Sequence, residues 1–416
     1  MAHVVGHLIM RVLFVSPYIP SLVRIRPYQW IRTLCRLGHT VHLIAVRPPE
    51  DSWLEDVPVR EWCASVSVFP LERTATLRNA VAAVPRGVPL QAAYSHHPEA
   101  EAAVAAAARQ CDVVHVEHLR GAVLADAVSD TPRVLDAVDS IAALFEQART
   151  RATSWKHRLM ASVDVGRTRR FEGQLARRFD RVVVASTRDA AVFHSLSPAS
   201  ARERIVSIPN GVDAEYWQPD IQRSSAKTIL FTGKMSYHAN ETAALRLLGR
   251  IMPIVWRSLP DAHVVLAGLD PSPDVRAHAA DSRVTVTGYV PDLRPHFHAA
   301  RLVMAPLEYG VGIQNKVLEA MASGVPVVAS NAACEGIGAV PDRDLLAGET
   351  DEELAAHAVA LFGDEHRRQA LARSGRRYVV ANHDWVTLSQ RLVAVYQDAC
   401  AMRASRPKGV LEGAAG

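Results

Sequence analysis

The stretch from residue 308 to residue 326 reads Glu308-Tyr309-Gly310-Val311-Gly312-Ile313-Gln314-Asn315-Lys316-Val317-Leu318-Glu319-Ala320-Met321-Ala322-Ser323-Gly324-Val325-Pro326. The apolar run before it, Leu302 to Ala305, predicts a buried strand. Glycines let a backbone approach a ligand closely, and a helix start offers free N–H groups. Lys316 adds a positive charge to the first helical turn, where the dipole favours an anion. A bound anion explains this lysine, and a solvated lysine in an ordinary strand-loop-helix turn is the alternative.

Length and composition describe an ordinary globular protein. The 416 residues predict two or three domains, and the net charge of +4 does not by itself imply nucleic acid as a partner. The five cysteines are scattered without metal-ligand spacing, so we expect a reduced, cytoplasmic protein and no metal site. There is no run of eighteen apolar residues and no charged region at the start, which predicts neither a membrane span nor a signal peptide.

The chain opens with the pattern of a doubly wound parallel sheet. Arg11 to Ser16 and Val41 to Val46 read as strands, and the residues between them, 27 to 37, read as a helix. The opening lacks G-x-G-x-x-G, so it has no nicotinamide or flavin fingerprint. Its loop instead carries Arg24 and Arg26, which could hold a phosphate or a carboxylate, or could be solvated surface charges.

Two polar residues follow later strands of this first sheet. His118 comes after the predicted strand at 112–116, and Asp139 comes after the strand at 133–138. Ligands bind at the carboxyl ends of parallel strands, so both side chains are candidate site residues. A packing histidine and a helix N-cap are the alternatives.

The segment from Arg149 to Arg181 is strongly basic. Phe171, Leu175 and Phe179 lie at helical spacing within it and form an apolar stripe. A basic amphipathic helix of this kind can lie on an anionic membrane surface. The alternative is a surface helix whose stripe packs into the core. No recognition motif accompanies these charges, so we do not expect nucleic acid.

A second sheet pattern begins at Thr228 to Thr232 and continues with strands at 263–267, 284–287, 302–305 and 325–329. We therefore expect an α/β protein with two doubly wound, Rossmann-like domains that face each other across a cleft. The expected boundaries are 1–208 for the first domain and 209–384 for the second. A helix at 385–402 should pack back on the first domain, and 403–416 should form a disordered tail.

The second half of the chain carries an ordered set of motifs. These are Val206 to Asp213, Phe231 to Met235, Val286 to Asp292, Lys316 to Val328, and Trp385 with Tyr396 in the final helix. The set resembles the retaining glycosyltransferases of family 4, which have the GT-B fold. The resemblance spans roughly residues 10 to 402, and the N-terminal half matches more loosely.

The resemblance implies a UDP- or GDP-linked sugar as donor and a glycan, a lipid-linked sugar or a small molecule as acceptor. It implies transfer with retention at the anomeric carbon, and neither a metal nor another cofactor. Asp139, Lys234 and Lys316 are the expected catalytic residues. The expected donor-binding residues are Gly233, Tyr289, Val290, Gly312, Ile313, Gln314, Asn315 and Glu319. Arg24, Arg26 and His118 are expected on the acceptor or phosphate side.

Four positions depart from the family pattern. Family members usually have a first glutamate where this chain has Val311, an arginine where it has Lys234, a lysine where it has Ala239 and a histidine where it has Asp139. In this form the chain resembles a subgroup of sugar transferases associated with exopolysaccharide and exosortase-type systems. We expect a cytoplasmic protein, with a peripheral place at the inner face of the plasma membrane if the basic segment 149–181 contacts lipid. A catalytically silent homologue that binds a nucleotide sugar or a protein partner, and a GT-B nucleotide-sugar epimerase, are the alternatives.

Overall fold

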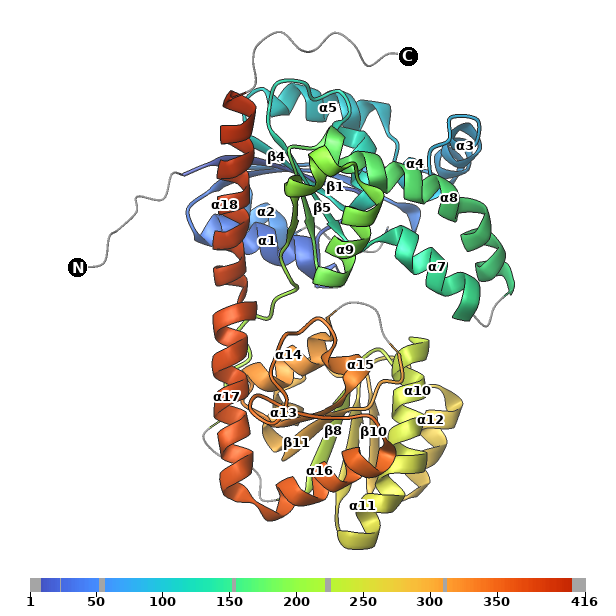
Figure 1. The fold of residues 1–416 in the computed structure, drawn as a ribbon, viewed down its shortest axis with the longest axis vertical. Helices are drawn as coiled ribbons and strands as arrows, with labels where there is room; N and C mark the ends of the chain where they lie inside the picture. Colours follow the sequence, from blue (N-terminus) through green and yellow to red (C-terminus); the bar gives the residue numbers. More distant parts are fainter. Residues whose placement is uncertain are drawn as a thin grey trace, which may run out of the picture. The chain divides into compact units, whose positions relative to one another are not determined.

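The computed structural model describes residues 9–22, 24–51, 57–151, 155–220, 226–309 and 313–405 of the protein. The chain divides into two compact units, one of residues 1–208 with 389–416 and the other of residues 209–388. Each unit is built on one parallel sheet with helices packed on its faces (Figure 1). No helix in the described part of the chain is long and apolar enough to cross a membrane.

The sheet of the first unit has the strand order β3-β2-β1-β4-β5-β6-β7 within the described residues. The strand order reverses direction between β1 and β4, which both pair in parallel with neighbours on either side. This point is where a doubly wound sheet binds ligands. The strands are β1 (Arg11–Ser16), β2 (Thr40–Arg47), β3 (Ser65–Pro70), β4 (Val113–Glu117), β5 (Arg133–Val138), β6 (Arg181–Val184) and β7 (Ile205–Ser207).

Helices cover both faces of this sheet, so its central strands are buried along their whole length. They are α1 (Ile25–Arg36), α2 (Val57–Trp62), α3 (Arg73–Ala83), α4 (Leu90–Ala93), α5 (Pro98–Ala108), α6 (His118–Gly121), α7 (Ile141–Arg151), α8 (Trp155–Arg178), α9 (Thr187–Leu196) and α18 (Trp385–Ala404). The first unit includes α18 from Ser389 onward. Short 3₁₀ turns lie at Pro49–Asp51, Ala122–Ala125 and Ala199–Arg204.

The sheet of the second unit has the order β10-β9-β8-β11-β12-β13 within the described residues. The strands are β8 (Thr228–Thr232), β9 (His263–Ala267), β10 (Val284–Gly288), β11 (Leu302–Ala305), β12 (Val327–Ser330) and β13 (Leu346–Gly348). The helices are α10 (His238–Arg246), α11 (Met252–Ser258), α12 (Pro273–Ala277), α13 (Arg294–Ala299), α14 (Asn315–Ala322), α15 (Asn331–Cys334), α16 (Asp351–Gly363) and α17 (Glu365–His383), with a 3₁₀ turn at His278–Ala280.

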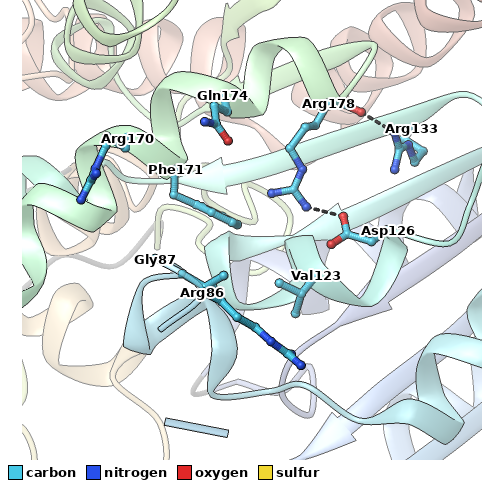
Figure 2. Close-up of a pocket in the computed structure, with 10 residues that line it drawn as sticks. Arg86, Gly87, Val123, Asp126, Arg133, Arg170, Phe171, Gln174 and Arg178 are labelled. Atoms are coloured by element: carbon cyan, nitrogen blue, oxygen red, sulfur yellow. Dashed lines mark hydrogen bonds and ion pairs between the residues drawn. The ribbon is translucent and has the colours of Figure 1, made fainter. Parts of the chain in front are cut away.

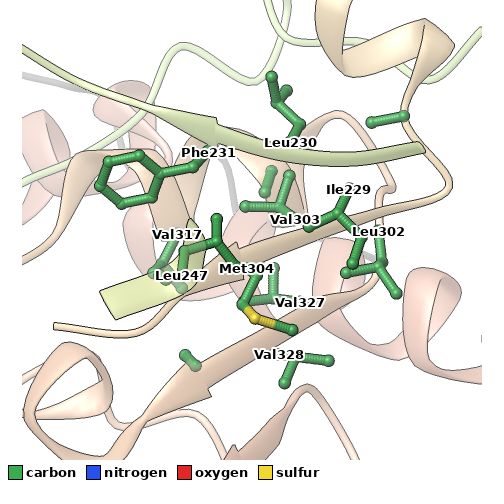
Figure 3. Packing of buried hydrophobic residues seen from close by; sticks show 14 of the residues in the cluster. Ile229, Leu230, Phe231, Leu247, Leu302, Val303, Met304, Val317, Val327 and Val328 are labelled. Carbon is green, nitrogen blue, oxygen red and sulfur yellow. The ribbon is translucent and has the colours of Figure 1, made fainter. Parts of the chain in front are cut away.

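Apolar side chains of β8, β11 and β12 form the centre of the second unit's core. Figure 3 shows Phe231, Val303 and Met304 packed together with Leu247 and Val317, which come from the covering helices. Val317 is completely buried on α14 and fixes that helix against the sheet. Packing of this kind holds the start of α14 in a defined place.

The predicted fold class is confirmed, since both units contain a doubly wound parallel sheet. Between α10 and α11 the chain forms a π-helical segment at Leu247–Ile251. Strand β13 was not predicted, because three residues show no periodicity. The last helix continues to Ala404, two residues beyond its predicted end at residue 402, and residues 406–416 lie outside the described part.

The basic stretch around α8 places its apolar stripe in the core. Phe171, Leu175 and Phe179 are 8%, 0% and 1% exposed and belong to the core of the first unit. The stripe therefore packs into the core and does not face solvent, as the second interpretation of this segment predicted. Leu175 and Phe179 are therefore shielded from a lipid surface, whereas Phe171 lines a surface pocket.

Two glycine loops of the second unit touch at the carboxyl ends of β8 and β9. Gly233 and Gly268 have φ angles of 152° and 151°, which L-residues with side chains rarely adopt. A β-carbon at residue 268 would lie 1.9 Å from the carbonyl oxygen of Gly233. The Gly233 N–H also donates to the Ala267 carbonyl at 3.2 Å. Only glycine at position 268 allows the two backbones to lie this close.

We expect Gly268→Ala to destabilise the protein by at least about 2 kcal/mol, because the new methyl group must displace backbone atoms of Gly233. Gly249→Ala is the matched control, since a β-carbon there meets nothing within 4 Å. Urea unfolding of both variants measures the difference. Equal stability of Gly268→Ala and the parent protein would contradict the close approach.

Candidate active site

A pocket of about 560 Å³ lies in the second unit, where the loops after β8, β9 and β10 meet the start of α14. Its lining residues are Thr232, Gly233, Lys234, Tyr237, Asn240, Gly268, Leu269, Tyr289, Val290, Leu293, Ile313, Gln314, Asn315, Lys316 and Glu319. These include every residue that we predicted for the donor side in the second domain, except Gly312. Gly312 lies outside the described residues. The structure thus gathers residues that are as far apart in the sequence as Gly233 and Glu319.

Lys316 is the dominant charge in this pocket. Its side chain is largely buried, and its Nζ donates to Oδ1 of Asn240 at 2.9 Å and to Oε1 of Gln314 at 3.2 Å. Both partners are neutral amides, and no carboxylate of the described residues lies within ion-pair distance. Burial lowers the pKa of Lys316 to about 8, and the nearby charge of Glu319 acts in the opposite direction. An anion entering the pocket would supply the negative charge that this ammonium group lacks.

Glu319 lies one helical turn after Lys316 on α14. Burial raises the pKa of its carboxyl group to about 7, and the positive charge of Lys316 opposes the rise. Two carboxylate oxygens at this position can accept hydrogen bonds from a pair of neighbouring hydroxyl groups. Lysine and glutamate therefore present one cationic and one hydroxyl-binding group on the same helix face.

Asn240 is a pocket residue that the sequence analysis missed. Its Nδ2 donates to the Lys234 carbonyl at 3.0 Å, and its Oδ1 accepts from Lys316. A β-carbon at Gly233 would lie 2.8 Å from Nδ2, so the glycine makes room for this amide. The preceding residue, Ala239, is buried and stands where the family usually has a lysine. Alanine in place of that lysine indicated that the start of α10 differs from the family pattern, but it did not point to Asn240.

The other predicted donor-side residues form the wall and mouth of the pocket. Lys234 is exposed at the end of β8, and Tyr289 is 70% exposed beyond β10. Gly288, with a φ of 69°, turns the chain before Tyr289 and Val290. An exposed aromatic ring and open backbone at a strand end suit a flat ligand such as a nucleobase.

Two residues with strained backbones lie at neighbouring strand ends in the first unit. His118 follows β4 with a φ of 63°, and Val138 ends β5 with a φ of 65°. For a β-branched residue such as valine this conformation is an outlier. The pairing of β5 with β6 is also irregular between Asp136 and Val138. Bulges and strain of this kind concentrate at functional sites and re-aim the residue that follows, which here is Asp139.

Asp139 does not cap helix α7. Ser140 does so, because its Oγ accepts from the Ala143 N–H at 3.1 Å, while Glu172 accepts from the Ile141 N–H at 2.7 Å. Burial raises the pKa of Asp139 to about 6, with Asp189 adding to the rise and Arg26 opposing it. The carboxyl group of Asp139 therefore lies just after the carboxyl end of β5. It does not have the helix-capping role that was the alternative to a site residue.

Arg26, which we expected on the acceptor or phosphate side, is buried in a bidentate ion pair. Its Nε and Nη2 donate to the two carboxylate oxygens of Asp136 at 2.8 and 3.2 Å, and Nη2 also donates to the Ile208 carbonyl at 3.0 Å. Trp30 donates to the same carboxylate at 2.9 Å. These bonds join α1, β5 and the end of β7, so a ligand would compete with Asp136 for Arg26.

Arg24 and His118 both lie near the ring of Tyr18. Arg24 stacks on the Tyr18 ring at 4.8 Å, and its Nη2 lies 3.8 Å from Oδ1 of Asp51. The His118 ring lies 6.2 Å from that of Tyr18, and its Nδ1 accepts from the Arg120 N–H at 3.2 Å. Burial lowers the pKa of His118 to about 3, so the imidazole is neutral near pH 7. A neutral histidine and a stacked arginine suit an uncharged or anionic ligand respectively.

His115, Glu117 and Asp136 bring three ligand-type atoms within 4.8 Å of one another in the first unit. All three side chains are completely buried. Asp136 already accepts the bonds from Arg26 and Trp30, and His115 is bonded to the Tyr396 hydroxyl at 2.8 Å. The bond from Tyr396 ties α18 to the sheet, while Nε2 of His115 and Oε2 of Glu117 are buried without a hydrogen-bond partner among the described residues.

Comparisons with known proteins agree with this geometry. Residues 26–216 match the family model described as Glycosyltransferase Family 4, and residues 226–364 match the one described as Glycosyl transferases group 1. The two matches follow one another along the chain, and each model describes glycosyl transferases. A search of curated proteins finds no match to the sequence.

Solved structures show the same fold at low sequence identity. Sucrose-phosphate synthase from Thermosynechococcus elongatus has a TM-score of 0.66 at 16% identity, with 94% of this chain and 100% of that chain covered. HepE from Anabaena, in complex with UDP and glucose, has a TM-score of 0.63 at 16% identity, with 93% and 99% covered. A glycosyltransferase from Rickettsia africae has a TM-score of 0.62 at 15% identity, with 94% and 98% covered. The chain therefore has the GT-B fold.

The lowered pKa of Lys316 predicts a pH dependence of anion binding in this pocket. We expect affinity for a nucleoside diphosphate to fall as pH rises through about 8, by up to roughly tenfold per pH unit, because the ammonium loses its proton. The fall should stop at the higher pKa that Lys316 has in the complex. Calorimetric titrations across this range measure it.

Lys316→Arg is the control, since a guanidinium stays charged over the whole range. This variant should bind with nearly constant affinity on either side of pH 8. A steep fall in both proteins would assign the pH dependence to another group.

Proposed function

We propose that the protein transfers a hexose from a UDP- or GDP-linked donor to a sugar, lipid-linked or small-molecule acceptor, with retention of the anomeric configuration. The observation that carries this proposal is that buried Lys316 and Glu319 lie on one face of α14. Both side chains line a pocket built from the ends of three parallel strands. HepE, which shares the fold, has been solved with UDP-glucose. That structure supports a nucleotide-sugar donor for this chain.

The diphosphate of the donor is assigned to Lys316 and Lys234. Departure of the nucleoside diphosphate places negative charge on the β-phosphate in the transition state. Lys316 is already desolvated, so its field acts on that charge with little screening by water. Lys234 adds an exposed positive charge at the mouth, and the backbone N–H groups at the start of α14 add hydrogen-bond donors. We propose that these groups act without a metal ion.

The nucleoside is assigned to Glu319 and to the wall of the pocket. The carboxylate of Glu319 accepts hydrogen bonds from both ribose hydroxyls, which fixes the sugar of the nucleotide. The ring of Tyr289 and the backbone at Val290 take the base edge. Glu319 makes its strongest hydrogen bonds when it is ionised. Because its pKa is raised to about 7, part of it is protonated in the free protein, and ribose binding favours the loss of that proton.

The acceptor side is assigned to the first unit, where Asp139, His118 and Arg24 follow or adjoin the carboxyl ends of the central strands. We propose that the pathway is the biosynthesis of a surface polysaccharide or glycoconjugate, as in exopolysaccharide production, on the cytoplasmic face of the membrane. WaaG, another structure of this fold, is described as a glycosyltransferase involved in lipopolysaccharide biosynthesis. That neighbour supports the choice of a surface glycan.

A catalytically silent homologue is the second candidate. It is favoured by Val311, which stands where the family usually has a glutamate and which cannot accept a hydrogen bond from a sugar hydroxyl. A GT-B epimerase is less favoured, because the Lys316 to Ala322 stretch follows the transferase pattern. Hydrolysis of the donor separates the silent homologue from the transferase.

The proposal is tested with a panel of UDP- and GDP-linked sugars, each assayed for hydrolysis and for transfer to added acceptors. We expect slow hydrolysis of one donor, weakened by Lys316→Ala through a loss of about 1.5–3 kcal/mol in binding. Glu319→Ala should weaken the binding of the ribonucleotide but leave its 2′,3′-dideoxy analogue little changed. Equal losses for both ligands would exclude the ribose role of Glu319, and no turnover of any donor would favour the silent homologue.

Asp139 is proposed to stabilise the sugar as the diphosphate leaves. An ionised carboxylate accepts a hydrogen bond from a sugar hydroxyl and favours positive charge at the anomeric carbon. Its pKa of about 6 leaves most of it ionised at neutral pH. The family usually has a histidine here, so Asp139 would bring a charge to a position that is commonly neutral.

Asp139→Asn should lower turnover at least about a hundredfold while the melting temperature changes little, because asparagine keeps the shape of the side chain but loses its charge. The control is Asp130→Asn, which removes the same charge from an exposed position of the same unit. Near-normal transfer by Asp139→Asn would remove this residue from the catalytic site.

A further inference from the structure

Helix α3 and the loop after it form a surface without acidic side chains. Residues 73–98 contain Arg73, Arg78 and Arg86 but neither aspartate nor glutamate. All three arginines are exposed. This part of the first unit therefore carries a local excess of positive charge, although the whole chain has a net charge of only +4.

The solvent side of α3 is apolar. Leu77, Val81 and Val84 are 69%, 67% and 55% exposed and follow one another at i, i+4 and i+7, which places them on one face of the helix. The opposite face holds the helix to the unit through the buried Asn79, whose Nδ2 donates to the His96 carbonyl at 2.8 Å. A water-facing helix normally carries polar side chains on such a face. This one instead exposes three large aliphatic side chains together.

A pocket of about 610 Å³ begins where α3 ends. Arg86, Gly87 and Val88 line one side of it, and the other lining residues are Val123, Asp126, Arg133, Arg170, Phe171, Gln174 and Arg178. Figure 2 shows the Phe171 ring in the middle of the pocket, with Arg170, Arg178 and Arg86 around it. Four arginines and a single aspartate line this space, so its charge is strongly positive.

The arginines of this pocket are only partly satisfied by the protein. Arg178 pairs with Asp126, and Arg133 donates to the carbonyl groups of Ala125 and Arg178. Arg86 makes no hydrogen bond or ion pair with a described residue, and Nε of Arg133 is buried without a hydrogen-bond partner among them. Guanidinium groups in such a setting bind phosphate oxygens well.

We propose that this face of the first unit docks on an anionic phospholipid bilayer, with Leu77, Val81 and Val84 inserted at the level of the headgroups and a lipid phosphate held in the arginine-lined pocket. The basic stretch of α8 was one candidate for membrane contact, but its apolar stripe is buried. The docking face assigned here instead combines exposed apolar side chains of α3 with arginines of both α3 and α8. This docking face rests on the proposed function in one respect, namely that the enzyme works at a membrane.

The chemistry favours a lipid surface over a soluble phosphate or an acidic protein. A soluble phosphate would use the arginines alone and leave the aliphatic face of α3 in water. Interfacial helices gain binding energy from both buried apolar area and attraction to anionic lipid, and this face offers both together. The attractions of basic residues to anionic lipid add together near a bilayer surface, so three or four arginines suffice for reversible binding.

Vesicle co-sedimentation of the full chain tests the proposal. Vesicles of phosphatidylcholine alone and of phosphatidylcholine mixed with phosphatidylglycerol are compared at low and high salt. We expect binding only to the acidic vesicles, weakened by salt because the attraction is screened. Leu77→Ser with Val81→Ser, and separately Arg86→Glu, should each lower the vesicle affinity roughly tenfold or more.

Matched controls make the same chemical changes on the second unit. Val340→Ser replaces a valine that is 44% exposed, and Arg373→Glu reverses an exposed arginine on α17. Both controls should bind acidic vesicles like the parent protein. Titration with nucleoside diphosphate in the absence of vesicles should give the same affinity for all variants, which separates a failure of docking from a failure of the proposed function.

Three results would overturn the proposal. One is equal binding of the parent protein and the Leu77→Ser, Val81→Ser variant to acidic vesicles. Another is equal binding to neutral and acidic vesicles. The third is binding of inorganic phosphate or glycerol 1-phosphate that depends on Arg86 while vesicles are not bound, which would make the pocket a site for a soluble anion.

Discussion

The carbonyl oxygen of Gly233 occupies the space that a side chain at residue 268 would need, and the shape of the pocket beside α14 depends on that close approach. With the two loops in contact, the amide of Asn240 fits beside Gly233 and bonds to the Lys234 carbonyl. The same amide then accepts a bond from Lys316. The close contact of Gly233 with Gly268 is thus linked to Lys316 through the side chain of Asn240.

The cation is held in an unusual way for a buried lysine. Amide oxygens orient the ammonium group but do not cancel its charge, so its desolvation is only partly offset. The large apolar core beneath α14, where Val317 and its neighbours are completely buried, offsets the unfavourable free energy of burying this charge. A stable sheet can carry a locally unfavourable group of this kind, and binding sites commonly use stability in this manner.

The sequence was sufficient to predict the sheets, because parallel strands with helices on both faces are continuous apolar runs and β1, β5, β8, β9 and β11 have that form. The motifs from Phe231 to Met235, Val286 to Asp292 and Lys316 to Val328 also predicted part of the pocket lining, but not Asn240. The sequence could not show the contact of Gly233 with Gly268, the bond from Asn240 to Lys316 or the ion pair of Arg26 with Asp136. Each of these joins residues that are far apart in the chain, and local patterns carry no information about such contacts.

Lys316 and Glu319 place two proton equilibria inside one ligand pocket. Near neutral pH the lysine keeps its proton, while the glutamate is divided between its two forms, since their pKa values are about 8 and about 7. A ligand that needs the carboxylate ionised must displace a proton into the solvent, and one that needs the ammonium must capture a proton at higher pH. The measured heat of binding would then include the ionisation enthalpy of the buffer, with opposite sign on the two sides of the interval between these pKa values.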